Sequence, residues 1–178
     1  MTFVQRFRRL FVPCALPVHL WAVLVYFYDL PGLMLRMSPA DFLAHGAYVL
    51  AFALFESAAL ALFFTLFSLP FSSARLPALE VILLVCGAWL LIGRALPLVG
   101  QFLSGRLPPE MVLPAFKAML VLLPVGLLAS LLGIRGFFRR RVDASARAAA
   151  LHERLSILMG AYLFVDMLSV GYILLRNF

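Results

Sequence analysis

Five apolar stretches, each long enough to cross a lipid bilayer, follow one another along this chain of 178 residues. A membrane-spanning helix needs about 20 mostly apolar residues, each of which advances the helix by about 1.5 Å. Only 13% of the residues are charged and 65% are hydrophobic, which leaves too little polar surface for a soluble domain. We therefore expect an all-α, polytopic integral membrane protein that folds as one domain of about five transmembrane helices. The predicted spans cover residues 10–30, 42–69, 77–102, 109–134 and 152–175.

Turn and cap signals separate these stretches. Pro31 and Gly32 predict that the first helix ends after Leu30, because proline cannot continue the hydrogen-bond ladder and glycine permits a turn. Ser38, Pro39 and Asp41 have the form of a helix start, with a capping hydroxyl, a proline in the first turn and an acid beside the N-terminal dipole. Asp143 precedes an alanine-rich run and could cap a helix that continues into the fifth span.

The basic residues predict an orientation. Cytoplasmic connections are enriched in arginine and lysine. With the N-terminus inside, ten arginines fall on the cytoplasmic side and three on the outer side, which favours a cytoplasmic N-terminus and an external C-terminus. Fourteen of the 15 basic residues are arginine, a bias that indicates a prokaryotic cell membrane. The net charge of +7 lies at the ends of spans, so we expect no nucleic-acid partner.

The longest polar segment is the predicted cytoplasmic loop 135–151. One interpretation is that its arginines only fix the orientation of the protein. The other is that they bind anionic lipid head groups or an acidic partner, since each surface arginine contributes about 1 kcal/mol against an anionic leaflet. The candidate lipid contacts are Arg135, Arg139, Arg140 and Arg141.

Four Asp, Glu, Arg or Lys residues fall deep inside the predicted spans, well away from their ends. A charge at the bilayer centre costs at least about 2.5 kcal/mol, so such side chains normally face protein or water and find partners. Two acids and two bases allow a neutral set, in which long basic side chains reach the carboxylates or extend outward to the interface. The candidate intramembrane polar network consists of Glu56, Arg94, Lys117 and Asp166.

Three functions compete for this network. In the first, the buried polar groups only hold the helices together, and the protein is a structural or accessory subunit that associates with another membrane protein or with copies of itself. In the second, the acids carry ions or protons in a small transporter or ion-conducting subunit, which prolines at positions 97, 114 and 124 support by freeing backbone carbonyls. In the third, the chain is an enzyme.

Enzymatic function is the weakest of the three. His152 and Glu153 begin a segment that lacks the second histidine of a zinc-protease signature, and no nucleophile elbow or glycine loop occurs. His19 and His45 lie at different depths, so we expect hydrogen-bonded or interfacial histidines and no haem. Cys14 and Cys86 form no CxxC pair, so neither a disulfide framework nor a metal site is expected. We therefore expect no cofactor, and we favour the structural or accessory role with transport as the alternative.

Overall fold

The structure is a computed structural model that describes the backbone of residues 1–72, 75–104, 109–140 and 144–177, and the side chains of residues 1–72, 75–96, 114, 117, 121–134, 146 and 148–177. Its elements are five helices: α1 (Phe3–Arg36), α2 (Pro39–Ser68), α3 (Leu76–Ser104), α4 (Pro109–Arg140) and α5 (Ala144–Asn177). Four of them are long and apolar enough to cross a membrane, and α4 contributes the shorter described apolar stretch Val121–Ile134. The expected all-helical class is confirmed.

The first helix is longer than its predicted span. It begins at a capping box, in which the Thr2 hydroxyl accepts from the Gln5 amide and the Gln5 side chain accepts from the Thr2 amide. The expected end at Pro31 and Gly32 is wrong, because α1 continues to Arg36 and the Met37 amide still donates to the Leu33 carbonyl. A proline removes one ladder bond without removing those that follow it, and membrane helices tolerate this loss.

The start of α2 follows the sequence prediction. Ser38 is the N-cap, and its hydroxyl oxygen accepts a hydrogen bond from the Asp41 amide at 3.2 Å. Pro39 occupies the first turn, where its missing amide costs nothing. The turn between α1 and α2 is therefore short because a proline-marked cap follows almost directly after Arg36.

The described residues of the predicted basic connection 135–151 are helical. The backbone of α4 is helical as far as Arg140, and α5 is helical from Ala144. Alanine and arginine are among the best helix formers, so the polar segment extends both helices beyond their apolar parts. The prediction that the alanine-rich run continues into the fifth span is confirmed, whereas the proposed cap Asp143 lies outside the described residues.

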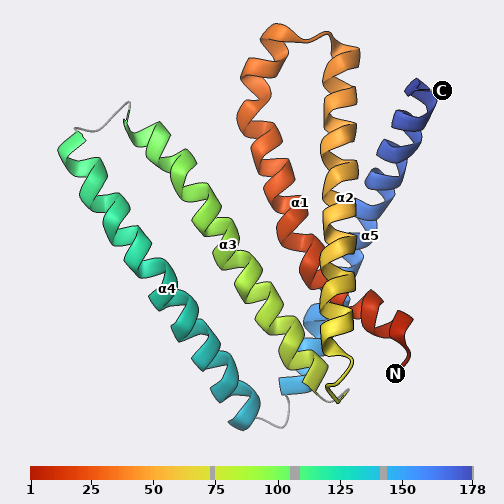
Figure 1. Cartoon of the computed structure of the whole chain (residues 1–178), viewed down its shortest axis with the longest axis vertical. Coiled ribbons are helices and arrows are strands. Elements are labelled where there is room, and N and C mark those ends of the chain that lie inside the picture. The colour runs from red at the N-terminus through yellow and green to blue at the C-terminus, as the bar shows by residue number, and fades with distance from the viewer. Residues whose placement is uncertain (73–74, 105–108, 141–143, 178) are drawn as a thin grey trace.

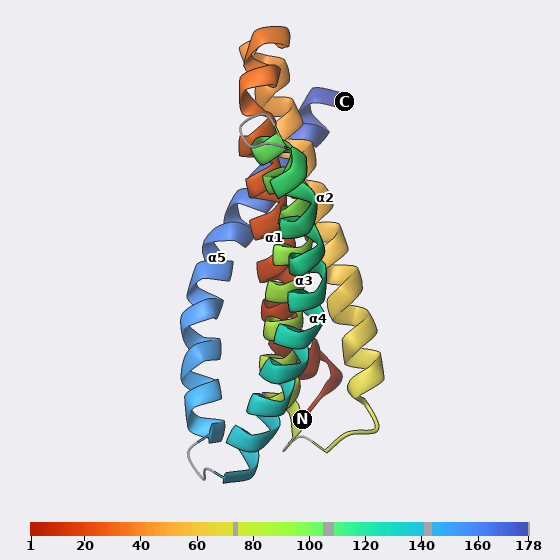
Figure 2. The same ribbon diagram turned by 90° about the vertical axis from the view of Figure 1, so that its left-hand side faces the viewer.

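The helices form two groups, α1 with α2 and α5, and α3 with α4, which meet where α3 packs on α1. Helices α1 and α2 form an antiparallel hairpin, and α5 packs against both of them (Figures 1 and 2). Helices α3 and α4 form a second hairpin, in which α3 packs along α1 and α4 lies mainly against α3. The N-terminus and the C-terminus lie at opposite ends of the bundle (Figure 1).

Small residues set the closest helix contacts. A Cβ atom added to Gly87 of α3 would lie 2.7 Å from Cγ of Pro17 on α1, and one added to Gly126 of α4 would overlap the Trp89 ring of α3. Only glycine permits these approaches. The main apolar cluster lies elsewhere, within the α1, α2 and α5 group, and consists of Phe11, Val12, Cys14, Ala15, Ala61 and Met159.

Candidate functional site

A buried histidine–aspartate pair joins α1 to α5. His19 Nε2 lies 2.8 Å from Asp166 Oδ2, and His19 Nδ1 lies 2.9 Å from the carbonyl oxygen of Ala15. Both side chains are 0% exposed. A backbone carbonyl can only accept a hydrogen bond, so Nδ1 must carry a proton that it donates to Ala15. One further proton then lies between Nε2 and the carboxylate, and the pair is neutral whichever atom holds it.

Ser57 of α2 completes a three-helix cluster. Its hydroxyl lies 3.4 Å from His19 Nδ1, but it donates to the Ala53 carbonyl at 2.6 Å. Serine, histidine and aspartate are also the components of hydrolytic triads, in which the histidine must accept the serine proton. Here Nδ1 already donates to Ala15, and Ser57 is also 0% exposed. The cluster therefore holds three helices together and offers no route to a substrate.

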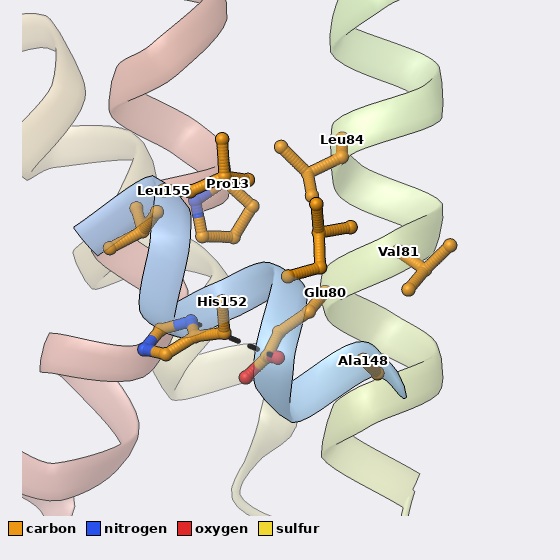
Figure 3. Close-up of a pocket in the computed structure, with 9 residues that line it drawn as sticks. Pro13, Glu80, Val81, Leu84, Ala148, His152 and Leu155 are labelled. Atoms are coloured by element: carbon orange, nitrogen blue, oxygen red, sulfur yellow. Dashed lines mark ion pairs between the residues drawn. The ribbon is translucent and has the colours of Figure 1, made fainter. Parts of the chain in front are cut away.

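A second polar cluster joins α1, α3 and α5 near the start of α3. Glu80 is 3% exposed and forms an ion pair with Arg9, while its Oε2 atom lies 3.9 Å from His152 Nδ1 (Figure 3). Within the described part of the chain, this Oε2 atom has no hydrogen-bond partner. It borders a pocket of about 10 Å³, which is the space that one water molecule occupies.

This second cluster was missed by sequence reasoning. Glu80 stands near the start of the third predicted span and is not among the four residues of the predicted polar network. The sequence feature that could have predicted this cluster is the similar depth of Glu80 and Arg9 along their helices. Arg9 lies just before the apolar part of α1, so both side chains fall near the same membrane surface, and an acid there has a basic partner within reach.

A third polar cluster joins α5 to α2 at the opposite end of the bundle. The Arg176 guanidinium donates to Asp41 Oδ1 at 2.7 Å and to the Ala40 carbonyl at 3.2 Å. Tyr172 also donates to Ala40, at 3.4 Å. These bonds join the end of α5 to the start of α2 and lie on the exposed surface.

A groove on the flank of α1 and α2 contains the other mid-span acid. It has a volume of about 350 Å³ and is lined by Trp21 from α1 and by Tyr48, Phe52 and Glu56 from α2, together with small aliphatic side chains. Glu56 is exposed, and no hydrogen bond or ion pair between described residues includes it. On α3, Arg94 places its guanidinium carbon 5.4 Å from the centroid of the Trp21 ring.

The structure does not assemble the predicted four-residue network. Asp166 pairs with His19 instead of Arg94 or Lys117, because α5 packs mainly on α1 and α2. The side chains of the other three residues, Glu56, Arg94 and Lys117, are exposed. Glu56 and Arg94 each lie beside Trp21, and the structure shows no direct contact between the two. The interpretation of His19 as a hydrogen-bonded histidine is confirmed. His45 stacks on Tyr26, with ring centroids 6.0 Å apart.

The other residues that the sequence analysis singles out are the candidate lipid-binding arginines and the two cysteines. The side chains of the four candidate lipid-binding arginines, Arg135, Arg139, Arg140 and Arg141, lie outside the described residues. Among the residues that the structure describes, no three His, Cys, Asp or Glu side chains are grouped so that they could hold a metal ion. Both cysteines are free thiols, with Cys14 buried and Cys86 half-buried.

No protein-family model, curated protein or solved structure matches this chain. Function must therefore be argued from the chain's own geometry.

Proposed function

We propose that this chain is a non-enzymatic, structural or accessory subunit of a membrane assembly. The observation that carries the proposal is the exposed guanidinium of Arg94, roughly two-thirds of the way along α3. Arginine cannot lose its charge in a protein, and a charge in the hydrocarbon region costs at least about 2.5 kcal/mol. The Trp21 ring lies against the guanidinium, and among the described residues no acceptor is hydrogen-bonded or ion-paired to it, which supports a partner subunit that supplies one.

Lys117 on α4 supports the same conclusion. Its side chain is exposed on the hairpin that the rest of the bundle covers least. A lysine near a helix end can extend to the membrane surface, so it argues less strongly than Arg94. Both basic side chains are exposed on the α3–α4 hairpin, and a second subunit that carries acceptors would pack there.

Purification in mild detergent tests this proposal. We expect a membrane protein to copurify in a fixed ratio, and we expect Arg94→Gln to lose it because the substitution removes the charge that the partner neutralises. Arg154→Gln is the matched control, since Arg154 is exposed at the opposite end of the bundle. A chain that purifies alone, or a partner retained equally by both variants, would contradict the proposal.

We further propose that the chain spans a prokaryotic cell membrane with its N-terminus in the cytoplasm and its C-terminus outside. The arginine asymmetry supports this orientation, and the opposite positions of the two termini support an odd number of crossings. Reporter fusions at Phe178 and after Arg141 test it. A cytoplasmic signal from the fusion at Phe178 would contradict the five-span topology.

Transport is the second candidate, and Glu56 is the observation that favours it. This acid lies near the middle of α2 in a groove that opens to the outside of the bundle, so an ion or proton could reach it without entering the core. Flux through reconstituted protein tests this role, with Glu56→Gln and Asp166→Asn as variants. Transport is supported if the unmodified protein carries an ion and either amide variant folds but does not, and it is contradicted if the unmodified protein shows no flux.

A further inference from the structure

The groove on α1 and α2 is shallow and open to the outside of the bundle, and it is large enough to hold a small molecule. Its volume of about 350 Å³ falls within the range of about 300–1,000 Å³ that is typical of ligand pockets. Residues of α1 form one wall and residues of α2, spaced three and four apart, form the other. Its aromatic side chains are accessible, since Tyr48 is 48% exposed and Phe52 is 66% exposed. A ligand could therefore enter from the side of the bundle.

The lining of the groove selects for positive charge. Three aromatic rings, those of Trp21, Tyr48 and Phe52, surround an apolar space with one carboxylate, that of Glu56. The faces of aromatic rings attract cations, and a carboxylate adds a full opposite charge. A ligand that carries negative charge would meet repulsion from Glu56 and from the electron-rich ring faces.

Trp21 already binds a cation within the molecule. The Arg94 guanidinium lies over its ring at 5.4 Å, which shows that this side chain is placed to make cation–π contacts. Arg94 also contributes a fixed positive charge at the edge of the groove. Because like charges repel, Arg94 must weaken the binding of any cation that Glu56 attracts.

The depth of the groove excludes strongly hydrated ions. Glu56 lies near the middle of α2, a helix long and apolar enough to cross a membrane. An inorganic cation would have to exchange its water shell for one carboxylate and three rings, which supply far too few oxygen ligands. An organic cation has a dispersed charge and apolar groups, so its transfer into this apolar groove costs less.

From these observations we propose that the groove between α1 and α2 binds a hydrophobic, monovalent organic cation, with Glu56 as the counter-ion and Trp21, Tyr48 and Phe52 as the aromatic walls. This site goes beyond the assembly role and does not depend on it. The assembly proposal rests on a partner that covers Arg94, whereas the ligand site rests on Glu56 and the rings beside it.

Binding of methyltriphenylphosphonium to the purified full-length protein in detergent tests the site. This probe carries a permanent charge, and triphenylphosphine oxide is a neutral compound of similar shape. Equilibrium dialysis measures both, and tryptophan fluorescence reports on the groove. We expect the cation to bind at least tenfold more tightly than the neutral compound.

Two variants should change the affinity in opposite directions. Glu56→Gln removes the counter-ion and should weaken cation binding at least tenfold, whereas Arg94→Gln removes the repelling charge and should strengthen it several-fold. Phe52→Leu should weaken binding while keeping the side chain apolar, because it removes one ring. Glu153→Gln is the matched control and should bind like the unmodified protein, since Glu153 is exposed far from the groove. Size-exclusion profiles and circular dichroism establish that each variant is folded.

Several outcomes would overturn the proposal. Equal binding of the cation and the neutral compound would mean that the groove takes apolar molecules such as lipid chains without regard to charge. Cation binding that survives Glu56→Gln in a folded protein would mean that the probe binds elsewhere. A partner helix cross-linked at Phe52→Cys, together with no cation binding by the unmodified protein, would mean that the groove is a protein interface. Because loss of cation binding leaves partner copurification unchanged, the two proposals fail separately.

Discussion

Among the side chains that the structure describes, polar contacts hold the α1, α2 and α5 group at three depths, whereas those that join the α3–α4 hairpin to this group lie mainly at one end. In the three-helix group, Arg6 donates to the Ser68 carbonyl at 2.6 Å at one end. The His19–Asp166 pair lies in the middle, and the Asp41–Arg176 pair lies at the other end. The hairpin is joined to α1 by the Glu80–Arg9 ion pair near the start of α3, and further along by the stacking of Arg94 on Trp21.

The difference matters because lipid provides little hydrophobic drive for helices to associate. Lipid chains are as apolar as leucine side chains, so close packing and polar contacts decide which helices stay together. The three-helix group combines both along its length. In the hairpin, the Trp89 indole donates to Ser130 at 3.2 Å and its ring covers Gly126, so close packing and a polar contact also join α3 to α4. We infer that the hairpin separates from the three-helix group before that group unfolds.

The largest expected effect comes from breaking the three-helix group at its centre. Asp166→Ala removes one member of a buried pair and leaves His19 Nε2 without a partner, which typically costs about 3–5 kcal/mol. Asp166→Asn should cost much less, because the amide can still hydrogen-bond to Nε2 at similar shape. Unfolding by sodium dodecyl sulfate in mixed micelles, followed by circular dichroism, measures both. Equal losses for the two variants would mean that the hydrogen bond is not the stabilising contact.

A smaller effect is expected at the junction between the two regions. Glu80→Ala removes the carboxylate that Arg9 binds, and hydrogen bonds to charged groups contribute about 2–3 kcal/mol. The loss should fall on the attachment of the hairpin and should leave the unfolding of the three-helix group almost unchanged. Limited proteolysis of the variant should therefore show earlier cleavage in the hairpin. Unfolding that remains a single transition, shifted as a whole, would mean that the two regions form one cooperative unit.

The packing between α3 and α4 can be tested by a substitution that adds one methyl group. Gly126→Ala places a Cβ atom against the Trp89 ring, and overpacking of this kind costs about 1–2 kcal/mol. Gly133→Ala is the matched control on the same helix, since no atom lies within 4 Å of its added Cβ and alanine favours helix. Thermal stability in detergent should fall for the first variant and stay level or rise for the second. A neutral Gly126→Ala would show that Trp89 does not pack as described.

The smallest effect is expected for the exposed pair at the far end of the three-helix group. Arg176→Ala removes the bond to Asp41, but both side chains are accessible to solvent, where ion pairs contribute little. The unfolding transition should not change measurably. A clear loss of stability would show that this end of α5 is held more tightly than its exposure implies.

The features of the fold that could be predicted from the sequence are those set by local signals within one helix. Apolar length identifies the spans, and the Ser38 cap fixes the start of α2, because both signals act within one segment. The end of α1 was wrong because a proline at position 31 has the same local chemistry whether a helix ends there or continues. The alanine-rich run before the fifth span could also be predicted as helix, because the helix propensity of alanine acts locally, whereas polarity marks the membrane surface and not the end of a helix.

The buried polar contacts could be predicted only in part. The cost of desolvation identifies Asp166 as a residue that needs a partner, but the partner depends on which helices are neighbours. His19 lies at a suitable depth, but histidine is not charged by default, so a count of opposite charges within the spans does not identify it as the partner. The cost of desolvation also predicts a partner for Glu56, but this side chain lies on the outside of the bundle. The sequence does not indicate which face of α2 the other helices cover.

The two native cysteines provide the most direct test, because each lies in one of the two regions. Cys14 is buried in the core of the three-helix group, and Cys86 is half-buried on α3 of the hairpin. Unmodified protein is titrated with sodium dodecyl sulfate, exposed to a small thiol reagent, and analysed by peptide mass spectrometry. The account predicts that Cys86 becomes modified at a lower denaturant fraction than Cys14, whose modification coincides with loss of helicity. Modification of both cysteines at the same fraction, or of Cys14 first, would contradict it.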